Sequence, residues 1–217
     1  WGKYSVEDVL IWNKNHLHLH LYETYIASYL QRNKKKIKDL RLLDGGCGIG
    51  RLIIYYKRKG YKICGVDSVL SAVEKAKQYD PQIEVSHGDI RTLSFPNESF
   101  DVYFSVGVIE HDTHGPTAIL KEANRVLKRK GLLLINIPVM NNFYKIFWPV
   151  IRLYHIPFIE NTIRKIFGKK PILKKEFDHY LYDKHEFRIA IERNGFRIVE
   201  LRPTMHIPGV AKACPLF

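Results

Sequence analysis

Residues 42–50 read Leu-Leu-Asp-Gly-Gly-Cys-Gly-Ile-Gly, a short apolar run that passes through one acid into a turn with four glycines. The apolar run predicts a buried strand, and the residues from Arg51 to Lys59 predict a helix directly after the turn. Glycine has no side chain, so a ligand can approach such a turn closely and the backbone can adopt positive φ angles. The free amides at the start of the helix are expected to point at that ligand. The stretch therefore predicts a binding site between the strand and the helix.

Strand and helix patterns alternate along the chain after this turn. Apolar runs predict strands at 61–66, 83–86, 100–108 and 132–137, and three- or four-residue periodicity predicts helices at 69–79 and 116–128. After an irregular segment, the pattern predicts a helix at 183–194, a helix stop at Gly195 and a strand at 196–201. Such alternation, with strands apolar on both faces, is typical of an α/β fold whose parallel sheet is covered by helices on two sides.

Composition narrows the class of protein. The chain has 35 Lys and Arg residues against 22 Asp and Glu residues, a formal net charge of +13. This surplus raises nucleic acid, anionic lipid and acidic small molecules as partners but selects none of them. The three cysteines have no metal-like or disulfide-framework spacing, which favours a reducing compartment and hence the cytoplasm. The most apolar stretch, 143–159, is interrupted by Lys145, Arg152 and His155, so we expect no transmembrane helix. The chain opens at Trp1 rather than Met, which leaves a preceding segment or a removed targeting peptide open.

The spacing of the glycines argues against two common phosphate-binding turns. Counted from Gly46 and Gly48, the third glycine of a dinucleotide fingerprint would fall on Arg51. The Gly-Lys-Ser/Thr ending of a P-loop is absent as well. Asp44 would repel a pyrophosphate at short range, whereas it suits a ligand that carries an amino group. We therefore expect a partly cationic cofactor.

The turn and later segments, taken in order, resemble the class I S-adenosylmethionine-dependent methyltransferases. The matching segments are 44–50, Gly65-Val66-Asp67-Ser68, Gly88-Asp89-Ile90, 100–111, 125–131 and Asn194-Gly195-Phe196. The resemblance implies a Rossmann-like fold with a mostly parallel sheet of seven strands, helices on both faces, N-terminal helices and an insertion after strand five. It also implies S-adenosylmethionine as the cofactor and S-adenosylhomocysteine as the product.

We expect a single methyltransferase domain, because a domain usually takes about 100–200 residues. In it, residues 1–38 form an N-terminal helical cap and residues 39–140 form the cofactor-binding core. Residues 141–182 form an insertion that serves as the acceptor lid, and residues 183–217 form the C-terminal helix and strands.

The cofactor-binding residues implied by the resemblance lie at the ends of the predicted strands: Asp44, Gly45, Gly46, Gly48, Gly50, Asp67, Ser68, Asp89, Ile90, Ser105 and Val106. Two carboxylate oxygens let Asp67 accept both hydroxyls of a ribose, although it could instead cap the helix that begins near Val69. Asp89 can accept from the adenine amino group while the Ile90 amide reaches the ring, although a plain turn aspartate is the alternative. The backbone of Ser105 and Val106 is expected to face the sulfonium end.

Methyl transfer is an in-line displacement from an activated sulfonium, so positioning can supply most of the catalysis. If a general base exists, His111 is the candidate, because it follows the fourth strand and an imidazole titrates near neutrality. A capping or orienting role for His111 is the alternative. The acceptor is expected to contact His111, Tyr144, Trp148 and Tyr180, although Tyr180 is equally compatible with the core. We expect no metal, because His16, His18 and His20 do not share one helix face.

The expected acceptor is a small or lipid-like molecule. The Asn/Asp-Pro-Pro-aromatic motif of adenine methyltransferases is absent after the fourth strand, and no cysteine suits cytosine methylation. Aromatic and basic residues are interspersed through 141–175, which favours a lid over a hydrophobic acceptor. Contact with an anionic membrane is a second interpretation, and a helical packing or dimer surface is a third. An RNA methyltransferase and a non-catalytic S-adenosylmethionine-binding partner subunit remain as alternatives. The sequence assigns no oligomeric state.

Overall fold

The computed structural model describes residues 17–140, 162, 165 and 180–202. Tyr144, Trp148 and most of the predicted insertion lie outside the described residues, as does the first of the two helices expected before residue 39.

The described residues form an α/β fold with a parallel sheet, as the alternating pattern predicts. The elements in chain order are α2 (Leu17–Asn33), η1 (Ile37–Asp39), β1 (Arg41–Gly45), α3 (Arg51–Arg58), β2 (Lys62–Asp67), α4 (Leu70–Tyr79), β3 (Val85–His87), β4 (Phe100–Val106), η2 (Ile109–His111), α5 (Thr117–Val126), β5 (Leu127–Asn136), β6 (Val139–Met140), β7 (Tyr182–Asp183) and α8 (Lys184–Arg193). The main sheet has the strand order β3-β2-β1-β4-β5, and all of its neighbours pair in parallel. A second parallel pair, β6 with β7, is separate from this sheet. The main sheet therefore has five strands among the described residues.

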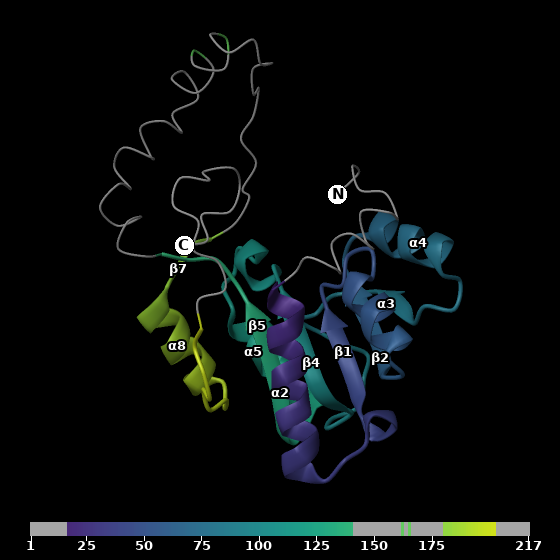
Figure 1. Cartoon of the computed structure of the whole chain (residues 1–217). Coiled ribbons are helices and arrows are strands. Elements are labelled where there is room, and N and C mark those ends of the chain that lie inside the picture. The colour runs from purple at the N-terminus through teal and green to yellow at the C-terminus, as the bar shows by residue number, and fades with distance from the viewer. Residues whose placement is uncertain (1–16, 141–161, 163–164, 166–179, 203–217) are drawn as a thin grey trace.

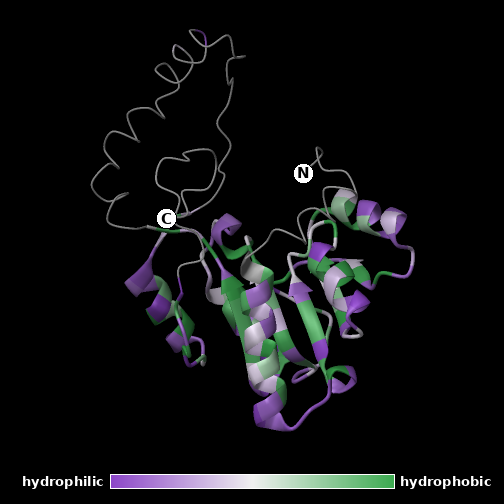
Figure 2. Ribbon diagram, in the orientation of Figure 1, coloured by the Kyte–Doolittle hydropathy of each residue, from purple (hydrophilic) through white to green (hydrophobic). Residues whose placement is uncertain are grey.

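Helices cover both faces of the sheet (Figure 1). Side chains of α2, α3 and α4 pack on one face around Leu42 and Phe104, and side chains of α5 and α8 pack on the other around Leu43 and Tyr103. Figure 2 shows the strands as hydrophobic, while the helices alternate between hydrophobic and hydrophilic residues. The sheet is apolar on both faces because each face is buried against a helical layer.

Helix α2 belongs to the core and is not only a covering element. Its buried side chains, Leu19, Tyr22, Ile26 and Tyr29, recur at three- and four-residue intervals along one face. The rings of Tyr22 and Phe104 meet edge to face with centroids 5.7 Å apart. Among the described helices, none combines the length and the hydropathy that crossing a bilayer requires.

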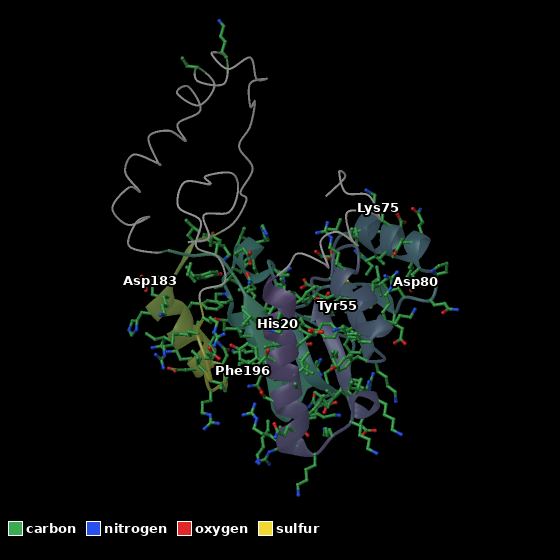
Figure 3. All side chains as sticks on the ribbon, in the orientation of Figure 1. His20, Tyr55, Lys75, Asp80, Asp183 and Phe196 are labelled. Atoms are coloured by element: carbon green, nitrogen blue, oxygen red, sulfur yellow. The ribbon has the colours of Figure 1, made fainter. Side chains whose placement is uncertain are left out.

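The predicted strand at 196–201 is wrong, because this segment has no regular secondary structure after the helix stop at Gly195. The side chains of Val199 and Leu201 are exposed. A groove of about 1480 Å³ separates the segment from β5, the last strand of the sheet. A hydrogen bond connects the segment to α2 instead, since the Tyr25 hydroxyl donates to Glu200 over 2.7 Å. In Figure 3, Phe196 and Tyr55 lie on opposite sides of α2.

A buried carboxylate ties three elements together at the end of the sheet where β4 begins. Asp101 is fully buried and accepts hydrogen bonds from the Arg41 amide at 3.0 Å, from Lys128 Nζ at 2.9 Å and from Lys35 Nζ. Burial raises the pKa of this carboxyl, but the hydrogen bonds from Arg41 and the two lysines outweigh it, so the pKa of Asp101 lies below its usual value.

We expect Asp101→Asn to lower the free energy of unfolding by about 1–3 kcal/mol at pH 7, because charge-assisted hydrogen bonds are lost. The lowered pKa makes the contribution of Asp101 present above about pH 4, and it is lost as the pH falls through the folded-state value. Urea unfolding of both proteins should therefore show a difference that narrows below about pH 4. The matched control is Asp80→Asn, whose carboxylate pairs with Lys57 at the surface and whose replacement should leave the midpoint unchanged. An equal loss in both variants would contradict the interpretation.

Candidate cofactor site

The predicted site residues lie at the carboxyl edge of the sheet, where the central strands end. Asp44 is the fourth residue of β1 and pairs in register with Gly65 of β2 and Phe104 of β4. Ligands of open parallel sheets bind outside the carboxyl ends of the strands, where neighbouring strands run to opposite sides of the sheet. β1 lies at that point, because the chain continues from it to β2 and β3 on one side and returns to β4 on the other.

The turn after β1 is fixed by hydrogen bonds to the end of β2. The amides of Gly46 and Cys47 both donate to the Val66 carbonyl, at 2.8 and 3.1 Å. The Gly48 amide donates to Asp67 Oδ2 at 2.6 Å. These three amides are therefore engaged within the protein, whereas the predicted donors are the amides at the start of α3. The turn offers a ligand its shape and its small residues.

Close packing explains why the turn needs glycine. Gly46 has φ of 79°, and a Cβ there would overlap the Val108 side chain that follows β4. At Gly45, a Cβ would overlap the hydroxyl of Tyr103, which passes beside the end of β1. The turn after β1 thus packs directly against β4 and the residues that follow it.

The Asp67 carboxylate connects the turn after β1 to the start of α4. Its Oδ1 accepts from the Val69 amide at 2.8 Å, directly before α4, while its Oδ2 holds the Gly48 amide. Its backbone carbonyl accepts from the Gly88 amide at 3.0 Å, which links the loop after β3 to the same point. Carboxylate oxygens have about two acceptor sites each, so both can accept a further donor. Ser68 is exposed next to Asp67.

Asp44 is a buried acid, and among the residues that the structure describes no cation contributes to its pKa. Its exposed fraction is 3 %, and burial together with the charge of Asp67 raises the pKa of its carboxyl to about 7. A buried carboxylate that is held at such cost favours a ligand that brings a positive charge.

Sequence reasoning missed Tyr22 of α2. Its phenol is buried and hydrogen-bonded with the side chain of Asn136 at the end of β5. The charge of Asp44 also contributes to the pKa of this phenol. Burial is the main reason that the pKa of Tyr22 is raised. No sequence pattern singled out Tyr22, because only the packing of α2 across the sheet brings it to the site.

The loop after β3 brings Asp89 and Ile90 to the same edge. Ile90 is buried, whereas the Asp89 side chain is partly exposed and forms an ion pair with Arg91 at 2.7 Å. The hydrogen bonds from Arg91 are the main reason that the pKa of Asp89 lies below its usual value. On the other side of β1, Ser105 is fully buried, and its Oγ has no hydrogen-bond partner among the described residues. Val106 is half-buried.

The predicted acceptor residues His111 and Tyr180 lie next to each other in the fold. His111 ends η2 and is exposed, and the Tyr180 amide donates to the carbonyl of its neighbour Glu110 at 2.7 Å. Tyr180 is 42 % exposed, so it is not a core residue. Tyr182 lies between Tyr180 and the body of the protein, with ring centroids 6.4 Å apart. Burial and the charges of nearby Asp112 and Glu110 raise the pKa of Tyr182 to about 12.

We expect Asp44→Asn to make the ligand-free protein more stable at pH 8. The raised pKa means that the folded state binds a proton more tightly than the unfolded chain, so stability is lost as the pH rises from about 4 through about 7. The neutral amide removes this loss, which we put at roughly 2–4 kcal/mol. Urea unfolding at pH 5 and pH 8 measures it, and the same pH dependence in both proteins would rule out a buried, titrating Asp44.

Comparison with known proteins agrees with this geometry. Residues 43–135, from the middle of β1 to near the end of β5, match a family described as a methyltransferase domain. A ubiquinone biosynthesis O-methyltransferase from Bradyrhizobium sp. is 33% identical over 124 residues, which cover 54% of this chain and 47% of the relative. A sterol 24-C-methyltransferase from Gibberella zeae is 37% identical over 108 residues, which cover 44% of this chain and 27% of the relative. The chain thus spans about half or less of the length of these relatives.

Solved structures share the fold. An S-adenosylmethionine-dependent methyltransferase from Thermotoga maritima matches with a TM-score of 0.52 and 24% identity, covering 86% of this chain and 82% of its own. A methyltransferase in complex with the Haloferax volcanii Trm112 methyltransferase activator matches with a TM-score of 0.56 and 19% identity, covering 77% and 66%. Residues 43–135, which hold the acidic strand ends and the glycine-rich turn, are thus similar to methyltransferase domains, and the described fold resembles that of S-adenosylmethionine-dependent methyltransferases.

Proposed function

We propose that this protein transfers a methyl group from S-adenosylmethionine to a small or lipid-like acceptor. The observation that carries the proposal is the row of acids at the carboxyl edge of the sheet. Asp44 lies in β1, Asp67 ends β2 and Asp89 follows β3, and these three strands are neighbours in the sheet. They match in order the ammonium group, the ribose hydroxyls and the adenine amino group of the cofactor, which are all hydrogen-bond donors.

The residues present fit this cofactor. The buried Asp44 gains a compensating positive charge, and a cofactor lying along the edge meets the glycine-rich turn, where Gly46 and Gly48 have positive φ angles and no side chains. We propose that Ser68 and Ile90 flank the adenine and that Val106 faces the sulfur end. The orphaned Oγ of Ser105 is a further polar atom on that side. When bound, the cofactor supplies a methyl group on an activated sulfonium, so the chain's own task is to orient the two reactants and exclude water.

The acceptor would meet the methyl group beside η2. We propose that His111 and Tyr180 line this side, because the hydrogen bond between the Tyr180 amide and Glu110 holds them at one place. His111 would orient the acceptor or remove a proton from it. We also propose Tyr144 and Trp148, and the lid at 141–182, as parts of the acceptor site. Relatives named for ubiquinone biosynthesis and sterol methylation support a lipid-like acceptor. We further propose a cytoplasmic location with contact to an anionic membrane, because the chain carries a net charge of +13.

The finer fold is also a proposal. We propose that the sheet continues beyond β5 to seven strands, because β5 has ten residues, an apolar Leu132–Ile135 stretch and, among the described residues, no neighbour on its outer edge. An open edge of this kind favours pairing with another strand. We expect the β5 amides that do not bond to β4 to exchange hydrogen slowly, at rates comparable with β4 amides, as measured by NMR. Fast exchange of these amides would leave the sheet at five strands.

Calorimetric titration with S-adenosylmethionine and S-adenosylhomocysteine tests the function. We expect micromolar binding to the wild type and a loss of about 1–3 kcal/mol in Asp67→Ala, because ribose hydroxyls and the Gly48 amide lose their acceptor. Asp80→Ala is the matched control, since this carboxylate lies after α4 and pairs with Lys57. Its affinity should equal that of the wild type.

The other outcomes separate the alternatives. Absence of binding by the wild type contradicts the proposal. Binding of the cofactor without turnover on any lipid-like or small aromatic acceptor favours the non-catalytic partner subunit, an alternative compatible with the activator complex among the similar folds. Binding of RNA that weakens steeply with salt, because released counterions drive it, favours the RNA methyltransferase.

A further inference from the structure

The side chain of Arg91 connects two loops at the mouth of the cofactor site. Its Nη2 lies 2.7 Å from Asp89 Oδ2, in the loop after β3. Its Nη1 lies 3.7 Å from Asp112 Oδ1, in the loop after η2. One guanidinium therefore faces two carboxylates that follow different strands of the sheet.

The Asp89 carboxylate is engaged by Arg91 on both oxygens. Its Oδ1 accepts from the Arg91 amide at 2.8 Å and from Nε at 3.0 Å, while its Oδ2 accepts from Nε at 3.0 Å and from Nη2 at 2.7 Å. Because the single Nε hydrogen is shared between the two oxygens, three N–H groups occupy most of the roughly four acceptor sites of the carboxylate. A further donor to Asp89 therefore competes with the contacts from Arg91.

The Asp112 carboxylate, in contrast, is only partly hydrogen-bonded. Its side chain is only 7 % exposed, and its Oδ1 accepts from the His114 amide at 2.9 Å. Its Oδ2 is buried without a hydrogen-bond partner among the described residues. A buried acceptor that lacks a partner costs free energy, so Asp112 is an acceptor that favours a new donor. Arg91 is the guanidinium beside it.

We propose that Arg91 acts as a latch on the cofactor site. Its guanidinium binds Asp89 in the ligand-free chain and moves to Asp112 when the adenine amino group binds Asp89. This inference rests on the proposed function, which assigns Asp89 to the adenine. Arg91 is then a positioning residue that acts through Asp89. Asp112 is the second carboxylate that binds the Arg91 guanidinium. Its position couples cofactor binding to the loop next to His111.

Replacement of Arg91 should tighten cofactor binding. We expect Arg91→Ala to bind S-adenosylhomocysteine about two- to fivefold more tightly than the wild type, the range that an exposed ion pair supplies. Arg91→Lys, which keeps the charge but lacks the planar fork, should lie between them. The gain should shrink as salt is added, because salt screens the competing ion pair. Arg188→Ala is the matched control, since Arg188 pairs with Glu192 on α8, and its affinity should equal that of the wild type.

Removal of the Asp112 carboxylate should instead weaken binding of the cofactor. We expect Asp112→Asn to weaken binding of S-adenosylhomocysteine about twofold or more, because Arg91 then has a poorer alternative to Asp89. In the double variant Arg91→Ala/Asp112→Asn this loss should vanish, because there is no guanidinium to transfer. Such non-additivity distinguishes a coupled pair from two independent structural effects.

S-inosylhomocysteine separates the latch from a general effect on the site, because its ring carries a carbonyl oxygen where adenine has the amino group. The gain in Arg91→Ala should be confined to S-adenosylhomocysteine. Equal gains for both ligands, or unchanged or weaker binding in Arg91→Ala, would overturn the latch while leaving the proposed function intact. A wild type that binds neither ligand would overturn the proposed function and the latch with it.

Discussion

The hydrogen bond from the Gly48 amide to Asp67 is the contact on which the cofactor site depends. It joins the turn after β1 to the end of β2, and the same side chain fixes the Val69 amide before α4. The Asp67 backbone carbonyl accepts from the Gly88 amide, which connects the loop after β3 to the same residue. One residue thus sets the relative positions of three loops that come from separate strands. A site assembled in this way keeps its shape without a ligand, which lowers the entropic cost of binding.

Two buried acids on neighbouring strands show how the same chemical group serves opposite ends of the sheet. At the end where β4 begins, Asp101 is matched by two lysines and an amide, and its pKa is lowered. At the carboxyl edge, the described part of the chain supplies Asp44 with no such partners, and its pKa is raised. The first arrangement stabilises the fold, whereas the second costs stability until a cation binds. The difference between them locates the functional edge independently of any motif.

Much of the fold was predictable because apolar runs end where strands end. That rule located Asp44, Asp67 and Asp89 at one edge before the structure was considered, since parallel strands share their carboxyl ends. It failed at 196–201, where an alternating pattern met no neighbouring strand and stayed unpaired. It also could not show which groups hold the amides of the glycine-rich turn. Their acceptors lie on β2, about twenty residues away in the chain, and local patterns carry no information about such contacts.

The least predictable part of the site is the set of groups that surround the motif acids. Tyr22 comes close to Asp44 from the helix that precedes β1, and Asp112 comes close to Arg91 from the loop after η2. Each is an ordinary residue by type and spacing, and each becomes relevant only through packing. In the proposed function, the motif acids specify which cofactor groups bind, because their positions follow the strand order. Their neighbours would then determine how strongly those groups bind, since they decide whether a carboxylate is buried at a cost in stability, as at Asp44, or already bonded to a guanidinium, as at Asp89. Differences in affinity between proteins with the same motif are therefore expected to arise in the residues around it.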